Sequence, residues 1–316
     1  MNTQQISALK PHGDGHQFVF YGDCASGIPG QLWGRNFAQV NNVLQRLYPE
    51  PEFIVFLGDH ILGSFAETHA EPLGIEKQWW DIKKQWHHWL NKEMDWLDSN
   101  RVPVYHVTSN HDTYDEASER VWREVFPGIP HNGPPDQKGL SYWVRRGDLL
   151  LVVVNTNFSG LGGNGHVECS WLDSTLTAQA DARYKIVAGH VPAFPVNGYD
   201  ERPRWCIAKG EAEDFWSVLT RHRVIAYLCS HIIAFDVQEH QGVLQVCSGG
   251  AGTNFGPGGT GEGQFMGEGE YHHFVQAALD ENEFRLQTVD KDGCVRERFT
   301  LKNYHAVGGQ FERLDR

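Results

Sequence analysis

Residues 53–60 read FIVFLGDH, an apolar run that ends in glycine and is followed by Asp59 and His60. Short runs rich in Val, Ile and Phe are typical of strands buried inside a sheet. A polar residue that follows such a strand lies at its carboxyl end, where open α/β sheets bind their ligands. The stretch therefore predicts a buried strand with Asp59 at the functional edge of a sheet.

Four further apolar runs end in the same way. The polar residues that follow these other runs are, in chain order, Asp23, Asn110, His111, Asp112, His190 and His231. Each alone has an ordinary explanation, such as a turn cap or a buried histidine. Together, carboxylates, an amide and imidazoles at five strand ends indicate one metal site. These nitrogen and oxygen donors suit Mn, Fe, Zn or a similar divalent ion, and the thiolates of a structural zinc site are missing.

The five motifs, in this order, resemble the signatures of the calcineurin-like metallophosphoesterase superfamily. They are GDC at 22, LGDH at 57, SNHD at 109, AGHVPAF at 188 and LCSHIIAFD at 228. The likeness covers about residues 15–250. The later half is most similar to the purple acid phosphatases, through ECSWLDSTL, YKIVAGHVPAF and VCSGGAGTNF.

The resemblance implies an α/β fold, α+β in some schemes. Specifically, we expect a four-layer α/β/β/α sandwich of two mixed sheets flanked by helices, with a two-metal site at one end. We find no linker that would divide the chain. We therefore expect a single domain over residues 1–316, with a core at about 15–300 and short tails.

The same resemblance assigns roles to the site residues. Asp59 would bridge two metals, Asn110, His190 and His231 would complete one site, and Asp23 would help to hold a weaker second ion. A metal-activated hydroxide would then attack phosphorus. His111 would donate a proton to the leaving oxygen, and Asp112 would orient that histidine.

Three positions depart from the family pattern. Many members have Asp-x-His in the first motif, where this chain has Ala25 in place of the histidine. Purple acid phosphatases have a tyrosine at the position of Leu62. The last motif usually has a second histidine, and this chain has Ile233 at that position. All three losses fall on one metal. The replacement donors are expected among nearby residues: Cys24, His60, or one of His12, His16 and His131. Alternatively, the second ion is held weakly, as magnesium often is, or a single metal binds.

These observations predict a metal-dependent phosphoester hydrolase that uses Mn, Fe, Zn or Mg, with one ion firmly bound and the second uncertain. The alternative is a degenerate phosphoesterase fold with one or no metal that binds a phosphate ligand or a protein. The expected partner is a small phosphoester substrate. The sequence leaves the oligomeric state open.

Charge and composition narrow the setting. The 316 residues are 40% hydrophobic and carry a formal net charge of -13, which disfavours binding to nucleic acid or to anionic membranes. There is no apolar signal region and no run of 18 apolar residues. The six cysteines are scattered, so free thiols and a cytoplasmic location are expected.

Three segments outside the motifs also carry predictions. Tryptophans and leucines at helical spacing over residues 77–99 indicate a helix that packs into the core. Residues 248–270 are rich in glycine and lack a phosphate-loop pattern, so a surface loop is expected. After residue 221, the pattern indicates strands of a second sheet that is mixed or antiparallel.

Overall fold

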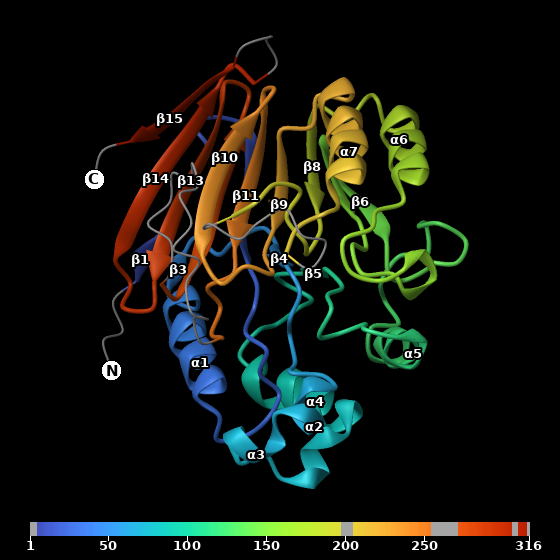
Figure 1. Cartoon of the computed structure of the whole chain (residues 1–316). Coiled ribbons are helices and arrows are strands. Elements are labelled where there is room, and N and C mark those ends of the chain that lie inside the picture. The colour runs from blue at the N-terminus through green and yellow to red at the C-terminus, as the bar shows by residue number, and fades with distance from the viewer. Residues whose placement is uncertain (1–4, 197–204, 254–270, 305–308, 315–316) are drawn as a thin grey trace.

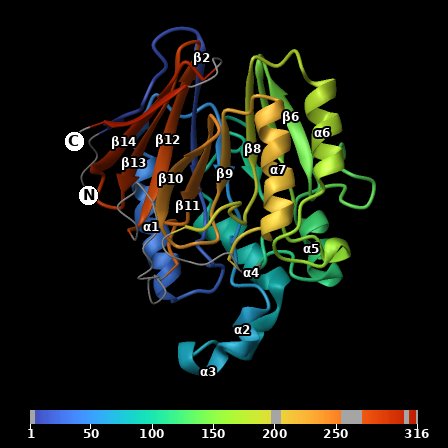
Figure 2. The same cartoon turned by 45° about the horizontal axis from the view of Figure 1, so that its top comes forward.

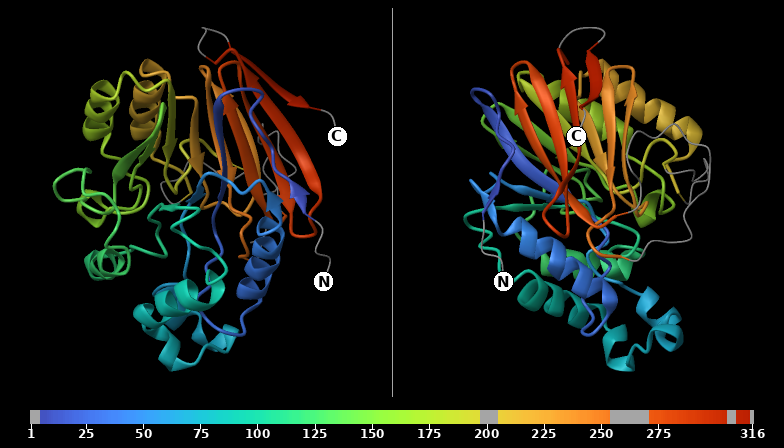
Figure 3. Two further views of the ribbon diagram at one scale, coloured as in Figure 1. Left: turned by 180° about the vertical axis from the view of Figure 1, so that it is seen from behind. Right: turned by 90° about the vertical axis from the view of Figure 1, so that its left-hand side faces the viewer.

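The computed structural model describes residues 5–196, 205–253, 271–304 and 309–314. Two β-sheets pack face to face, and helices cover both outer faces (Figure 1). Figure 3 shows α6 and α7 on one side of the sandwich and α1 on the other. The expected four-layer α/β/β/α architecture is confirmed.

The larger sheet has seven strands in the order β15-β14-β13-β12-β2-β4-β5. Its strands are β2 (Gly15–Tyr21), β4 (Ile54–Phe56), β5 (Val104–His106), β12 (His273–Asp280), β13 (Glu283–Asp290), β14 (Val295–Lys302) and β15 (Gln310–Leu314). Strands β2, β4 and β5 run parallel, and the others pair antiparallel. Strands β1 (Ile6–Ser7) and β3 (Leu47–Tyr48) form a separate short pair.

The second sheet has six strands in the order β10-β11-β9-β8-β7-β6. Its strands are β6 (Tyr142–Arg146), β7 (Leu149–Val153), β8 (Tyr184–Ala188), β9 (Ala226–Cys229), β10 (Phe235–His240) and β11 (Val243–Ser248). The helices are α1 (Leu32–Leu44), α2 (Phe65–Thr68), α3 (Ala70–Leu73), α4 (Ile82–His88), α5 (Glu116–Val125), α6 (Cys169–Ala178) and α7 (Lys209–Arg221), with short turns η1 (Lys77–Trp80), η2 (Trp89–Glu93) and η3 (Ser159–Leu161). Helices α2 and α3 project beyond the sandwich (Figure 2).

Alternation along the strands divides the core into layers. On β2, Phe18 and Phe20 face the second sheet, while Val19 and Tyr21 join the cluster beneath α1. On β7, alternate residues enter the core between the sheets and the core beneath α6 and α7. Because successive side chains of a strand point to opposite faces, each central strand supports two apolar layers.

The five apolar runs that predicted strands all form strands, namely β2, β4, β5, β8 and β9. The expectation for the chain after residue 221 was incomplete. Strands β9, β10 and β11 extend the second sheet, whereas β12 to β15 return to the first sheet beside β2. Pairing of β12 with β2 brings together segments more than 250 residues apart, and such long-range pairing leaves no local signal in a sequence.

The tryptophan-rich segment is helical and packs into the core, as expected. However, η1, α4 and the π-helical turn η2 divide it into three pieces. Trp86 and Trp89 are fully buried.

The glycine-rich segment lies outside the described residues from 254 to 270. None of the six cysteines, all of which lie within the described residues, forms a disulfide. Among the described residues, no helix combines the length and the apolar character that a bilayer crossing requires.

A histidine at the start of β2 links the two sheets. His16 Nδ1 lies 3.0 Å from Glu52 Oε2, and its Nε2 lies 2.8 Å from Asp148 Oδ1, in the turn between β6 and β7. Burial lowers the pKa of His16, but the hydrogen bonds and charges of the two carboxylates outweigh burial and raise it above its ordinary value. The protonated imidazole therefore ties the sheets together.

We expect His16→Gln to lower the free energy of unfolding most below pH about 6.5, the ordinary histidine pKa. A group with a raised folded-state pKa stabilises the fold below its unfolded pKa, and this contribution is lost as pH rises through the folded pKa. Urea unfolding at pH about 6 and pH about 9 measures the difference. The variant His12→Gln, at an exposed histidine, is the control. A cost for His16→Gln that does not change with pH would contradict the ionic link.

Candidate metal centre

Four side chains converge beyond the carboxyl ends of the parallel strands. His190 Nε2 lies 3.0 Å from Asn110 Oδ1, 3.1 Å from His231 Nδ1 and 3.3 Å from Asp59 Oδ1. Ligand atoms of Asp59, His190 and His231 all lie within 4.8 Å of one another. These four are the residues that the sequence assigned to one metal, and the fold brings them together.

The hydrogen bonds of His190 fix which of its nitrogens is available. Its Nδ1 lies 2.8 Å from the carbonyl oxygen of Leu57. A carbonyl oxygen only accepts, so Nδ1 carries the hydrogen and Nε2 presents a lone pair to the cluster. Ser230 Oγ donates to the same carbonyl at 2.9 Å. A second hydrogen bond that fixes the imidazole tautomer is typical of metal-ligating histidines.

The backbone at the site is held in an unusual conformation. Asp23, Asp59 and His231 have φ angles of 65°, 52° and 68°. Non-glycine residues in this left-handed region cost about 1–3 kcal/mol each. The strand ends also lie close together at Gly58. A Cβ added at this glycine would lie 2.7 Å from both the His190 Nδ1 and the Ser109 Cβ. Tight turns after the strands thus direct the ligand side chains into one space.

Two carboxylate oxygens at the site, Asp23 Oδ1 and Asp59 Oδ1, are buried and accept no hydrogen bond from the described residues. The other oxygen of Asp23, Oδ2, accepts from the His231 amide at 2.8 Å. Buried polar atoms are normally satisfied, so such oxygens require an explanation. A divalent cation fits both oxygens and the lone pair of His190, since buried charges are paired or coordinate metals.

The two aspartates differ in their protonation. Burial raises the pKa of Asp23 well above its ordinary value, and the nearby charge of Asp59 raises it further. Burial also opposes ionisation of Asp59, but the charges of His111, His190 and His231 outweigh it and lower the pKa of Asp59. Without a cation, the proton therefore resides on Asp23 and the negative charge on Asp59.

His111 lies at the edge of the cluster. Its Nε2 is 3.8 Å from Asp59 Oδ2, and its Nδ1 is 3.0 Å from the carbonyl oxygen of Leu62. The ring stacks on Phe65, with centroids 4.3 Å apart. On the other side, the ring centroids of Trp205 and His231 lie 6.1 Å apart. Aromatic rings therefore border the cluster on two sides.

A family model of the calcineurin-like phosphoesterases matches residues 13–235. The chain belongs to this family. Its relatives include the Danio rerio serine/threonine-protein phosphatase CPPED1, at 26% identity over 244 residues, which are 74% of this chain and 71% of that protein. Tartrate-resistant acid phosphatase type 5 of Sus scrofa is 23% identical over 175 residues, covering 49% of this chain and 48% of that protein.

Solved structures share the calcineurin-like phosphoesterase fold. The purple acid phosphatase PPD1 from yellow lupin matches 93% of this chain and 55% of its own, with a TM-score of 0.69 and 13% identity. GAP50, described as the anchor in the inner membrane complex of Plasmodium, matches 91% of this chain and 88% of its own, with a TM-score of 0.55 and 14% identity. The expected likeness to purple acid phosphatases is thus confirmed.

The role predicted for Asp112 requires a correction. Asp112 accepts hydrogen bonds from His60 Nδ1 at 2.7 Å and from Ser109 Oγ at 2.8 Å, whereas the His111 ring donates from Nδ1 to the Leu62 carbonyl. The Leu62 carbonyl orients His111 instead. Ser109 Oγ also accepts from the Asp59 amide at 2.8 Å. Asp112 therefore holds the turns that carry the ligands rather than the general-acid candidate.

The sequence did not identify a row of two histidines behind the site, of which His60 is buried and His106 partly exposed. His60 Nε2 lies 3.0 Å from His106 Nδ1, so Asp112, His60 and His106 form one hydrogen-bonded chain. The rings of Trp86 and Trp89 pack around His60. A residue adjacent to a strand-end ligand points to the opposite face. This alternation was a usable signal for His60, whereas His106 gave none.

The three positions that depart from the family pattern carry no donor side chain. Ala25 and Leu62 are buried, and Ile233 is partly exposed. The nearby candidates for replacement are engaged elsewhere. Cys24 contacts the carbonyl of His60, and the His60 ring pairs with Asp112 and His106. His12 pairs with Glu283, and His16 pairs with Glu52 and Asp148. His131 lies beside Gly139. Among the described residues, Asp23 Oδ1 and Asp59 Oδ1 therefore remain as unsatisfied carboxylate oxygens at the cluster.

We expect His231→Ala to weaken Mn²⁺ binding at least tenfold, because the variant removes one of four converging donors while its neighbours remain. Titration with Mn²⁺ followed by electron paramagnetic resonance of the free ion measures the affinity. The matched control is His166→Ala, since His166 pairs with Glu211 away from the cluster. Equal affinities for the two variants would contradict the assignment of His231.

Proposed function

We propose that this protein is a metal-dependent phosphoester hydrolase. The observation that carries the proposal is the convergence of Asp59, Asn110, His190 and His231, together with the two unsatisfied carboxylate oxygens. A small phosphoester is the proposed substrate. Phosphatase relatives and membership of a phosphoesterase family support this reaction class.

The four converging residues would hold one divalent ion, which we propose to be Mn, Fe, Zn or Mg. When bound, such an ion supplies positive charge that attracts phosphoryl oxygens and promotes deprotonation of water. The chain's own contribution is orientation. The Leu57 carbonyl keeps the lone pair of His190 directed at the cluster, and the left-handed backbone of Asp59 turns its carboxylate into the same space.

His111 would act as the general acid. The Leu62 carbonyl accepts from Nδ1 and so orients the ring, and Nε2 is directed toward Asp59. From this place, an Nε2–H can donate to the leaving oxygen of a phosphoester. Phe65 fixes the plane of the ring by stacking. Proton donation by a positioned histidine contributes about 10²–10⁴-fold to the rate.

A second ion would be held weakly. Asp23 and Asp59 would be its side-chain ligands, and Asp23 must lose a proton before it can bind a cation. Two carboxylates with water and substrate phosphate are a ligand set of the kind that magnesium uses. The opposite outcome, in which one ion binds without turnover, would make the protein a phosphate-ligand or protein-binding member of the fold.

With Mn²⁺, we expect turnover of p-nitrophenyl phosphate or of bis(p-nitrophenyl) phosphate, and we expect His111→Asn to lower kcat at least about 100-fold. Manganese content of the variant stays at the wild-type level, because the ligands are intact. The control is His69→Asn, at an exposed histidine. Manganese binding without hydrolysis of either ester by the wild type would support the non-catalytic alternative.

Ile233→His is expected to raise the bound Mn²⁺ from one ion per chain toward two. The substitution places an imidazole where the family has its second histidine, beside a position with two carboxylates. Elemental analysis after loading and desalting gives the stoichiometry. The matched substitution Ile232→His tests the neighbouring position, which is buried. Two ions in the wild-type protein would show that the second position is already complete.

A further inference from the structure

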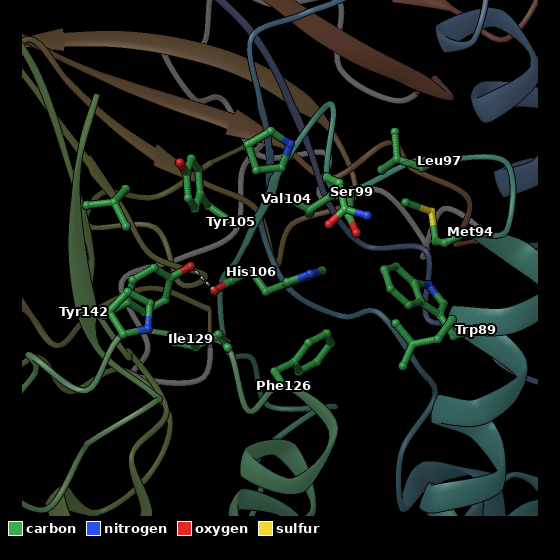
Figure 4. A pocket seen from close by; sticks show the side chains of 16 residues that line it. Trp89, Met94, Leu97, Ser99, Val104, Tyr105, His106, Phe126, Ile129 and Tyr142 are labelled. Carbon is green, nitrogen blue, oxygen red and sulfur yellow. Dashed lines mark hydrogen bonds between the residues drawn. The ribbon is translucent and has the colours of Figure 1, made fainter. Parts of the chain in front are cut away.

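A cavity of about 710 Å³ lies on the far side of the histidine row, away from the metal ligands. It opens where β5, the last strand of the larger sheet, faces β6, the last strand of the other sheet. Figure 4 shows the backbone of β5 crossing its floor between Tyr142 and Trp89. The volume is in the range of small-molecule sites, about 300–1,000 Å³.

The lining is aromatic and uncharged. The ring side chains of Trp89, Tyr105, Phe126 and Tyr142 border the space, and Met94 lies beside Trp89 (Figure 4). No Asp, Glu, Lys or Arg is among the described residues that line it. Flat aromatic walls favour a flat ligand through stacking. A wall without cations, in a protein of net charge -13, does not favour an anion.

The floor of the cavity offers backbone hydrogen-bonding groups. Ile54 on β4 donates to Pro103, and Val107 donates to Phe56, so the ladder to β4 uses the odd-numbered residues of the β5 segment. Because backbone groups alternate along a strand, those of Val104 and His106 face the open edge. The His106 carbonyl accepts from the Tyr142 hydroxyl at 2.9 Å. In the part of the chain that the structure describes, nothing bonds to the Val104 amide, the Val104 carbonyl or the His106 amide, so these groups remain for a ligand.

His106 adds a directed acceptor to this edge. With a neutral His60, its Nδ1–H donates to Asp112, its Nε2 accepts from His106 Nδ1, and His106 Nε2 carries the lone pair. Burial lowers the pKa of His106 well below its ordinary value, which keeps the ring neutral. His106 Nε2 has no partner among the described residues.

We propose that this cavity binds an uncharged, planar nitrogen heterocycle of nucleoside size. The ring would stack among the aromatic side chains, donate an N–H to His106 Nε2, and pair with the donor and acceptor groups of Val104. Ser99 and Asn100 at the rim would contact a polar substituent such as a sugar. This site is separate from the metal centre, and the proposal does not depend on the reaction assigned to it.

The short length of β5 argues against an extended peptide as the occupant. The strand has three residues, Val104–His106, and one of its outward carbonyls is already bonded to Tyr142. Strand addition gains its affinity from several consecutive backbone hydrogen bonds. Here, Val104 alone has both of its backbone groups available, which suits the donor and acceptor edge of one heterocyclic ring.

Adenosine is the probe for the test. Isothermal titration of the full chain loaded with Mn²⁺ is expected to give a Kd below about 1 mM, and inorganic phosphate is not expected to displace the nucleoside. The absence of binding at that concentration would overturn the proposal. Displacement by phosphate would also overturn it, because it would locate the nucleoside at the metal centre.

Variants locate the bound ring. Asn100→Trp, at an exposed position on the rim, narrows the cavity and is expected to weaken adenosine binding at least tenfold. His106→Phe removes the acceptor and is expected to weaken binding about tenfold. The control is Asp95→Trp, at an exposed residue of the same segment that does not line the cavity. Circular dichroism confirms folding, and wild-type affinity in Asn100→Trp would overturn the proposal.

Discussion

The carbonyl oxygen of Leu57 accepts hydrogen bonds from His190 and from Ser230, and this one acceptor joins the ends of the two sheets. Leu57 follows β4 of the larger sheet, while the two donors follow β8 and β9 of the other. The bonds fix the distance between strand ends and also determine which nitrogen of His190 faces the ligand cluster. Packing of the sandwich and chemistry of the site thus depend on the same contact.

That contact explains an asymmetry within the site. One side of Asp59 is surrounded by the side chains of His190, Asn110 and His231. The Nε2 atom of His190 lies about 3 Å from Asn110 Oδ1 and from His231 Nδ1. On the other side, Asp59 faces Asp23, which shares its burial but lacks a partner for one oxygen. Burial and the charge of Asp59 raise the pKa of Asp23, whereas the neighbouring histidines lower the pKa of Asp59.

Local pattern was sufficient to predict much of this arrangement. The apolar runs predicted the central strands, and the polar residues after them include the side chains that converge, because both signals lie within a few residues of each other. The return of β12 to β2 was not predictable, since it depends on pairing over a long sequence separation. The contact between Asp112 and His60 was missed for a related reason. Packing against Trp86 and Trp89 places the His60 ring where it contacts Asp112. No sequence motif records this packing.

The left-handed backbone of Asp23 has an evolutionary consequence. Glycine would adopt this conformation without strain, and it would remove a buried carboxylate that lacks a full set of donors. Selection for folding alone would therefore favour the loss of Asp23, and the same holds for Asp59 and His231. These residues therefore cost the fold stability, and a cation bound among their side chains would offset part of that cost.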